Sequence, residues 1–127
     1  MSDSSTAEVG KIGWIDMTVA NAPELKEFYC KVVGFEAADV SMGDYSDYMM
    51  NMPASGEAVA GVCHARGGNS DLPGGWLIYF VVADVEASAA ACTANGGELL
   101  FEPRALAGGR FCVIRDPNGA TAALYQP

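Results

Sequence analysis

The chain has 127 residues, of which 50% are hydrophobic and 18% are charged. This balance is enough for one compact domain with an apolar core, and it excludes a disordered or low-complexity chain. The 7 basic residues against 16 acidic ones leave a net charge of −9. A field of that sign repels phosphate backbones and anionic lipids, so neither nucleic acid nor a membrane surface is an expected partner.

The cysteines and the N-terminus indicate the compartment. Four cysteines are spread along the chain without a Cys-x-x-Cys pair, and there is one histidine, so neither a structural zinc site nor a disulfide framework is expected. Residues 1–10 are polar and predict a flexible tail, not a secretory signal. The longest apolar run, residues 76–83, is far shorter than the roughly 20 residues of a membrane-spanning helix. We expect a cytoplasmic protein with reduced, mostly buried thiols.

The first half of the chain begins with a strand predicted over residues 11–20, where apolar side chains alternate with others. A helix over residues 22–33 follows, because Asn21 suits an N-cap and Gly34 suits a helix stop. The next three predicted strands cover residues 35–40, 45–51 and 57–65. Residues 66–75 are rich in glycine, proline, asparagine and aspartate and predict the longest loop.

The same pattern then restarts. A strand is predicted over residues 76–83, and a helix over residues 85–95 is capped by Asp84 and ended by Gly96-Gly97. The last three predicted strands cover residues 98–102, 109–115 and 120–125. The turn at residues 116–119, with the sequence Asp-Pro-Asn-Gly, favours a hairpin between the final two strands.

The two halves agree in spacing as well as in order. Asp84 follows Asn21 by 63 residues (84 − 21), and at this offset Gly97 corresponds to Gly34. Although identity between the halves is low, this agreement predicts a duplicated strand–helix–three-strand unit. Such a unit would not bury its sheet face alone, so we expect the two copies to pack as one domain. The expected boundaries are about 11–65 and 76–127 for the modules, 66–75 for the linking loop and 11–127 for the whole domain.

Four stretches together carry a resemblance to known proteins. They are Trp14-Ile15-Asp16-Met17-Thr18 with Phe28-Tyr29 and Gly34-Phe35, then Val59-Ala60-Gly61, then residues 76–85, and last Gly96-Gly97 with Asp116-Pro117-Asn118-Gly119. In this order they resemble the vicinal oxygen chelate superfamily, which includes glyoxalase I, extradiol dioxygenases and bleomycin-resistance proteins. The resemblance implies an α+β fold of two βαβββ modules whose sheets curl round a central cavity with the helices outside. It also implies that a homodimer is plausible.

The chemistry of this superfamily uses a metal held by His, Gln or Glu near the start and the end of each module. At the first of these positions the chain has Trp14 and Leu77, and at the later ones it has Ala60 (or Val59) and Ala123. None of these offers an oxygen or nitrogen donor, and divalent metals need several. We therefore expect no metal and no other cofactor, and the fold alone implies neither glyoxalase I nor dioxygenase activity.

The alternation of side chains along each strand predicts which of them face the cavity. If Ile15, Met17 and Val19 pack under the first helix, then Trp14, Asp16 and Thr18 face away from it. The offset of 63 residues adds Ala60, Val62 and His64 to that face. The residues expected to bind a ligand there are Trp14, Thr18, Tyr48, Met50, Val62, Leu77, Tyr79, Phe111, Ala123 and Tyr125. An apolar, aromatic lining with few polar groups is typical of a small-molecule pocket.

Asp16 and His64 are the candidates for proton transfer, because an acid in an apolar pocket titrates high and a histidine titrates near neutrality. The alternatives are a structural carboxylate for Asp16 and a surface histidine for His64. Neighbouring strand residues point to opposite faces, so Cys63 and His64 are not expected to form a nucleophile pair. The four arginines that follow His64 are each expected to be solvated charges, although a forked contact to an anion is open to any of them: Arg66, Arg104, Arg110 and Arg115.

Three functions remain in view. The first is metal-free binding of a small, partly apolar or aromatic molecule in the sheet-lined cavity, as in the bleomycin-resistance branch. The second is a metal-independent enzyme of the same fold in which Asp16 or His64 moves a proton. The third is a metal-dependent lyase or dioxygenase with unusual ligands, such as Asp16 together with His64, and it ranks last because two donors are too few.

Overall fold

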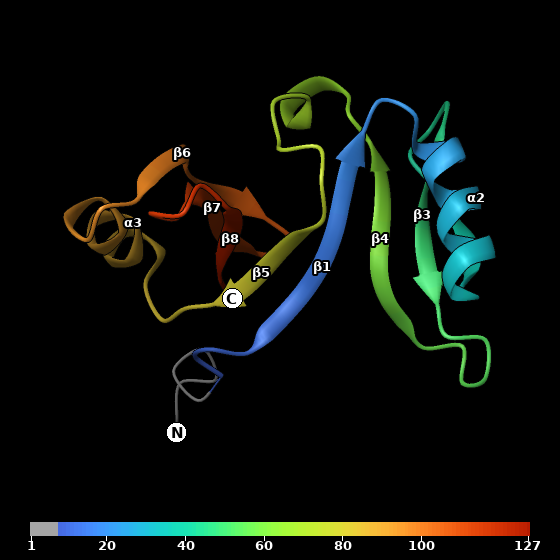
Figure 1. The fold of residues 1–127 in the computed structure, drawn as a ribbon, viewed down its shortest axis with the longest axis horizontal. Helices are drawn as coiled ribbons and strands as arrows, with labels where there is room; N and C mark the ends of the chain where they lie inside the picture. Colours follow the sequence, from blue (N-terminus) through green and yellow to red (C-terminus); the bar gives the residue numbers. More distant parts are fainter. Residues whose placement is uncertain (1–7) are drawn as a thin grey trace. The chain divides into compact units, whose positions relative to one another are not determined.

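The computed structural model describes residues 8–127 (Figure 1). Its strands and helices alternate in the predicted α+β order, with one short 3-10 helix, η1 (Gly67–Asn69), in the long loop. In chain order the other elements are β1 (Ile12–Val19), α2 (Ala22–Val33), β2 (Glu36–Ser41), β3 (Ser46–Asn51), β4 (Ala58–His64), β5 (Leu77–Val81), α3 (Val85–Ala94), β6 (Glu98–Leu106), β7 (Gly109–Arg115) and β8 (Thr121–Gln126).

The strands form a mixed eight-stranded sheet in the order β2-β3-β4-β1-β5-β8-β7-β6. β1 runs parallel to β4 and β5 runs parallel to β8, whereas the other registered neighbours are antiparallel. Each parallel pair joins the first and last strands of one β-α-β-β-β run. The βαβββ pattern predicted from the repeat is thus confirmed for both halves.

The chain divides into two compact units. One consists of Ile15–Trp76, called here the 15–76 unit. The other consists of Leu77–Pro127 together with residues 8–14, and it is called the 77–127 unit. The Gly10 amide donates to the Val81 carbonyl and the Val81 amide donates to the Lys11 carbonyl, both at 2.9 Å. The chain just before β1 therefore belongs to a unit whose other members come from the far half of the sequence.

In the 15–76 unit, α2 begins and ends where the sequence predicted, but its N-terminus is held differently. Gly34 adopts a φ of 99° and its amide donates to the Cys30 carbonyl at 3.0 Å, which closes the helix in the left-handed conformation that glycine tolerates. Asn21 occupies the N-cap position, yet its side chain accepts no helix amide. Its Nδ2 instead donates to Glu24 Oε1 at 3.2 Å.

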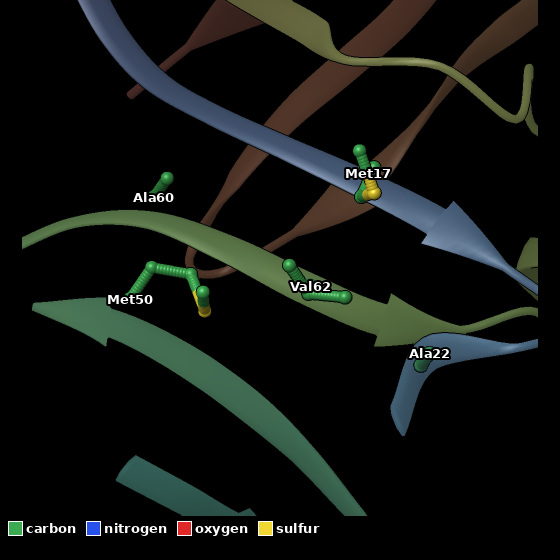
Figure 2. Close-up of a cluster of buried hydrophobic side chains, with 5 residues drawn as sticks. All are labelled: Met17, Ala22, Met50, Ala60 and Val62. Atoms are coloured by element: carbon green, nitrogen blue, oxygen red, sulfur yellow. The ribbon is translucent and has the colours of Figure 1, made fainter. Parts of the chain in front are cut away.

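The core of this unit lies between α2 and one face of the sheet. Figure 2 shows its buried members, which come from β1, β3, β4 and the start of α2: Met17, Met50, Ala60, Val62 and Ala22. Leu25, Tyr29 and Cys30 of α2 pack against them. Because Met50 and Val62 are fully buried, these two side chains contribute much of the apolar area that this unit removes from water.

The 77–127 unit repeats this design with a smaller helix face. Val85 and Ala89 of α3 pack on Cys112 and Leu124 of the sheet. Asp84 caps α3 as predicted, since its Oδ1 accepts the Ala87 amide at 3.1 Å. The predicted hairpin turn is also formed, with Asp116 Oδ1 accepting the amides of Asn118 at 2.8 Å and Ala120 at 3.0 Å.

The largest error in the predicted strand bounds concerns β6. The prediction ended this strand at residue 102, but β6 continues to Leu106. It lies at the end of the strand order and changes register between Leu99 and Phe101 and again between Phe101 and Arg104. An edge strand with such irregularities tolerates Pro103, which has no amide hydrogen to give to a neighbour.

Three further predictions concern the N-terminal tail, the cysteines and membrane-spanning helices. The predicted tail falls largely outside the described residues, of which 8–10 form a turn. The cysteines are free thiols, but only Cys112 is fully buried, and Cys30, Cys63 and Cys92 are partly exposed. Within residues 8–127, no helix has both the length and the apolar character needed to cross a bilayer.

Candidate functional site

The side of the sheet opposite α3 carries a cluster of aromatic side chains. In the 77–127 unit Phe80, Cys112 and Leu124 pack toward α3. Tyr79 is paired with Ala123, and Phe111 is paired with Tyr125, so all four lie on the opposite side, because directly paired residues share a face. Leu77, two residues before Tyr79, shares this side. The alternation therefore predicted these faces of β5 and β8 correctly, whereas ligand contact by these residues stays a prediction.

We call Tyr79, Phe101, Arg104, Phe111 and Tyr125 the aromatic face. The ring centroids of Tyr79 and Phe111 are 6.1 Å apart. The Arg104 guanidinium carbon lies 4.1 Å from the Phe101 centroid and 5.6 Å from the Phe111 centroid, within the range of a cation–π contact. Tyr79 and Phe111 are each only 6% exposed, but Phe101 and Tyr125 are partly exposed and Arg104 is exposed. The aromatic face thus has a buried part and an accessible rim.

Tyr125 is held in place by its hydroxyl group and by a glycine. Its Oη donates to the Ala107 carbonyl at 3.0 Å. A Cβ atom on Gly109 would lie 2.7 Å from this Oη and 2.8 Å from Cζ. The missing side chain at Gly109 therefore makes room for the phenol ring, which fixes one end of the rim.

Arg110 and Arg115 have ordinary surface contacts. Arg110 contacts the Glu86 carboxylate, and Arg115 lies 3.2 Å from Glu98. These pairs agree with the expectation of solvated charges. Arg104 differs because its guanidinium lies over two rings, those of Phe101 and Phe111. Sequence reasoning missed Phe101 and could not single out Arg104, because the irregular register of β6 sets their positions.

In the 15–76 unit, part of the predicted cavity lining lies on the other face. Val62 is paired with both Met17 and Tyr48, and Ala60 is paired with Met50, so all of them face α2. The prediction that Tyr48, Met50, Ala60 and Val62 share a face with Asp16 is wrong.

The cause is a difference in spacing between the two halves. Val62 corresponds in its packing to Leu124, an offset of 62 residues (124 − 62), not 63. A shift of one residue moves every side chain of a strand to the opposite face. The caps and glycines that gave the offset of 63 lie around the helices, so they carried no information about this later strand.

Asp16 and Thr18 do lie away from α2, as predicted, since they are paired with Gly61 and Cys63. Thr18 is 5% exposed, and Asp16 and Trp14 are partly buried. Burial, together with the charges of Asp16 and Asp47, raises the pKa of the Cys63 thiol to about 12. Cys63 is therefore protonated at neutral pH and is not a nucleophile.

His64 has an acidic partner that the sequence did not reveal. Asp47 Oδ1 accepts the His64 backbone amide at 2.9 Å and lies 3.2 Å from His64 Nδ1. The side chains are 19% and 12% exposed for His64 and Asp47. The imidazole also contacts the rings of Tyr45 and Tyr48, with centroid distances of 5.3 and 6.1 Å. An aspartate inside a strand is unusual, and this was the one sequence signal available for Asp47.

The two predicted proton-transfer residues do not share a face of the strands. Asp16 is opposite Gly61, whereas His64 is opposite Val19, three positions further along β1. His64 stands at the last position of β4, where its ring turns toward Asp47. The acid–base arrangement that the geometry supports is therefore Asp47 with His64.

The superfamily's metal does not fit the side chains of this chain. The positions where the resemblance implies ligands hold Trp14, Leu77, Ala60 and Ala123, which have no donor atom suited to a divalent ion. In the part of the chain that the structure describes, no three His, Cys, Asp or Glu side chains are grouped so that they could hold a metal ion.

Comparisons with known proteins agree with this fold. "Putative glyoxylase CFP32" of Mycobacterium tuberculosis (strain CDC 1551 / Oshkosh) is 31% identical over 122 residues, covering 94% of this chain and 45% of that protein. "Anthracycline biosynthesis protein DnrV" of Streptomyces peucetius is 25% identical, covering 95% of this chain and 43% of that protein. The chain thus spans less than half the length of these curated relatives.

Among solved structures, methylmalonyl-CoA epimerase of Streptomyces coelicolor has a TM-score of 0.54 at 23% identity, with 93% of this chain and 97% of that one covered. At this identity the likeness shows the fold alone. The sequence model of one family matches residues 11–124, nearly the whole chain. The chain therefore belongs to the Glyoxalase/Bleomycin resistance protein/Dioxygenase superfamily.

Proposed function

We propose that the chain binds a small, partly apolar or aromatic molecule against the side of its sheet that faces away from the helices, without a metal ion. The observation that carries this proposal is the accessible rim of the aromatic face, where Phe101 and Tyr125 are partly exposed and the Arg104 guanidinium lies over the Phe101 ring. A flat ligand gains about 0.5–1.5 kcal/mol from each favourable ring contact beyond the area that it buries.

The curated relatives suggest which probe to use. One of them is named for anthracycline biosynthesis, and anthracyclines are flat, fluorescent ring systems that carry a cationic amine. The net charge of −9 on this chain favours a cationic ligand at long range. An anthracycline therefore tests both the ring contacts and the electrostatics in one titration.

The experiment is a fluorescence titration of the full chain with an anthracycline, repeated in the presence of a chelator. We expect saturable binding of one molecule per chain that the chelator does not change. Phe101→Ala should weaken binding by about 2- to 10-fold, the equivalent of one ring contact. Leu106→Ala is the matched control, because Leu106 is an exposed apolar residue on the same strand. Non-saturable binding, or equal effects of the two substitutions, would contradict the proposal.

A second function, proton transfer without a metal, is favoured by the contact between Asp47 and His64. It places a titratable ring, oriented by a carboxylate, at a partly accessible position. Should turnover of a carbonyl substrate be found, His64→Gln should lower it about a hundredfold or more, which is the scale of general acid–base catalysis. Asp16→Asn distinguishes the two original candidates, and we expect the smaller loss there.

Metal independence has its own test. Elemental analysis of protein purified without a chelator should find no stoichiometric divalent ion. A content near one ion per chain would instead support the metal-dependent alternative with ligands at unexpected positions. Two further parts of the proposal are a homodimer, to be checked by light scattering during gel filtration, and a cytoplasmic location, to be checked by cell fractionation.

A further inference from the structure

We propose that Asp47 holds the imidazole of His64 as the Nδ1–H tautomer, so that Nε2 accepts a hydrogen bond from an O–H or N–H group of a bound small molecule, such as a phenol. Both parts are independent of the binding proposed for the aromatic face, because Asp47 and His64 belong to the 15–76 unit and the aromatic face belongs to the 77–127 unit.

The first step concerns one carboxylate oxygen. Oδ1 of Asp47 receives the His64 backbone amide at 2.9 Å and lies 3.2 Å from Nδ1 of the same residue. An ionised carboxylate only accepts hydrogen bonds, so a bond to the ring requires the hydrogen to be on Nδ1. In a neutral imidazole the other nitrogen then carries the lone pair, and the bond made by one nitrogen sets the state of the other.

The second step concerns rigidity. Asp47 is buried and contacts both the backbone and the ring of His64, so the ring cannot leave without giving up a hydrogen bond to a buried charge. The rings of Tyr45 and Tyr48 contact the imidazole as well. The direction of Nε2 is therefore fixed before any ligand arrives, which lowers the entropy cost of recognition.

The third step concerns the groups around the ring. Among the described residues, Asp47 is the one hydrogen-bond partner of the imidazole. Lys26 lies over the Tyr48 ring at 5.0 Å, and Arg66 lies over the Tyr45 ring at 4.0 Å. Each cation lies on a tyrosine ring and not on the imidazole itself, and 19% of the His64 side chain is exposed to solvent.

Because His64 is the single histidine of the chain, nuclear magnetic resonance of protein labelled with ¹⁵N-histidine gives one unambiguous pair of ring signals. At a pH above the imidazole titration we expect a protonated Nδ1 and a bare Nε2 in the unmodified chain. Asp47→Ala should move the hydrogen to Nε2 or give a mixture. Asp47→Asn should retain the Nδ1–H form, since its amide oxygen still accepts.

Asp39→Ala is the matched control, because Asp39 is exposed on the neighbouring strand β2 opposite Tyr48; it should leave the ring signals unchanged. If the Asp47→Ala variant does not fold, the ring signals of the unmodified protein and of Asp47→Asn decide whether the proposal holds. An Nε2–H ring in the unmodified chain would overturn the proposal, and so would an unchanged tautomer in folded Asp47→Ala.

The recognition part is tested with 2-naphthol and its methyl ether, which differ in the donor hydrogen. We expect the naphthol to bind roughly 5- to 100-fold more tightly, as one hydrogen bond predicts, and to shift the Nε2 signal. In His64→Gln the difference should shrink. Equal binding of both compounds, or binding of neither, would refute recognition by Nε2. The tautomer is decided by the resonance experiment alone.

Discussion

Replacing Met50 tests whether this residue packs beneath α2 or lines a ligand site. Its side chain is fully buried among Met17, Ala60 and Val62. Truncating a buried methionine to alanine costs about 2–5 kcal/mol, the sum of lost transfer free energy and the cavity left behind. β3 is paired with β2 on one side and with β4 on the other, where the register shifts between Met50 and Asn51, and we expect the loss for Met50→Ala to fall within that range.

The control is a methionine two positions away. Met52 is 41% exposed, so Met52→Ala should change the free energy of unfolding by less than about 0.5 kcal/mol. The assay is urea unfolding followed by tryptophan fluorescence, with the slope against urea checked for constancy between variants. Equal losses for Met50→Ala and Met52→Ala would refute the packing. So would a Met50→Ala protein that keeps its stability but loses ligand affinity, because a pocket wall behaves in that way.

Three further predictions use single side chains. At pH 8 the alkylation of Cys63, followed by mass spectrometry, should be slower than that of a free thiol by about three orders of magnitude, because a pKa raised from 9.0 to about 12 removes the thiolate. The same pKa shift means that Cys63 contributes stability below pH 9 and that this contribution is lost as the pH rises to about 12. An alkylation rate like that of a free thiol would contradict both predictions. Asp84→Ala should cost about 1 kcal/mol in urea unfolding, as the loss of a cap does, whereas Asn21→Ala should cost less because its side chain accepts no helix amide; equal losses would argue against the observed caps. Gly109→Ala should weaken anthracycline binding, because the added Cβ would clash with the Gln126 backbone oxygen and with the Tyr125 ring, and an unchanged Kd would contradict a role for this end of the rim.

Local sequence signals predicted the bounds of helices and strands well where a terminating glycine or a turn ends the element. The helix over residues 22–33 matched because Gly34 terminates it with a positive φ, and the strand over residues 109–115 matched because turns flank it on both sides. The strand that begins at Glu98 was cut short at Pro103, since proline excludes a central strand but not an edge strand. Such an edge position depends on the order of strands, which no local pattern contains.

The candidate site was harder to predict than the fold, for a related reason. Two modules with the same order of elements need not keep the same residue count between helix and last strand, so the face of Val62 could not be read from Tyr125. The partner of His64 lies 17 residues earlier in the sequence and has no spacing rule that connects the two. Tyr79 and Phe111 were identified correctly because strict alternation along one strand, and pairing with its neighbour, need no assumption about distant spacing.

The hydrogen bonds that tie Gly10 and Lys11 to Val81 have a consequence for how the chain is made. Gly10 and Lys11 are synthesised before Val81, whose carbonyl and amide bond to them and which follows Lys11 by 70 residues (81 − 11). Closing so long a loop is entropically costly, and contacts of this kind slow folding. The segment that contains Gly10 and Lys11 should therefore be the last part of the newly synthesised protein to gain protection from hydrogen exchange.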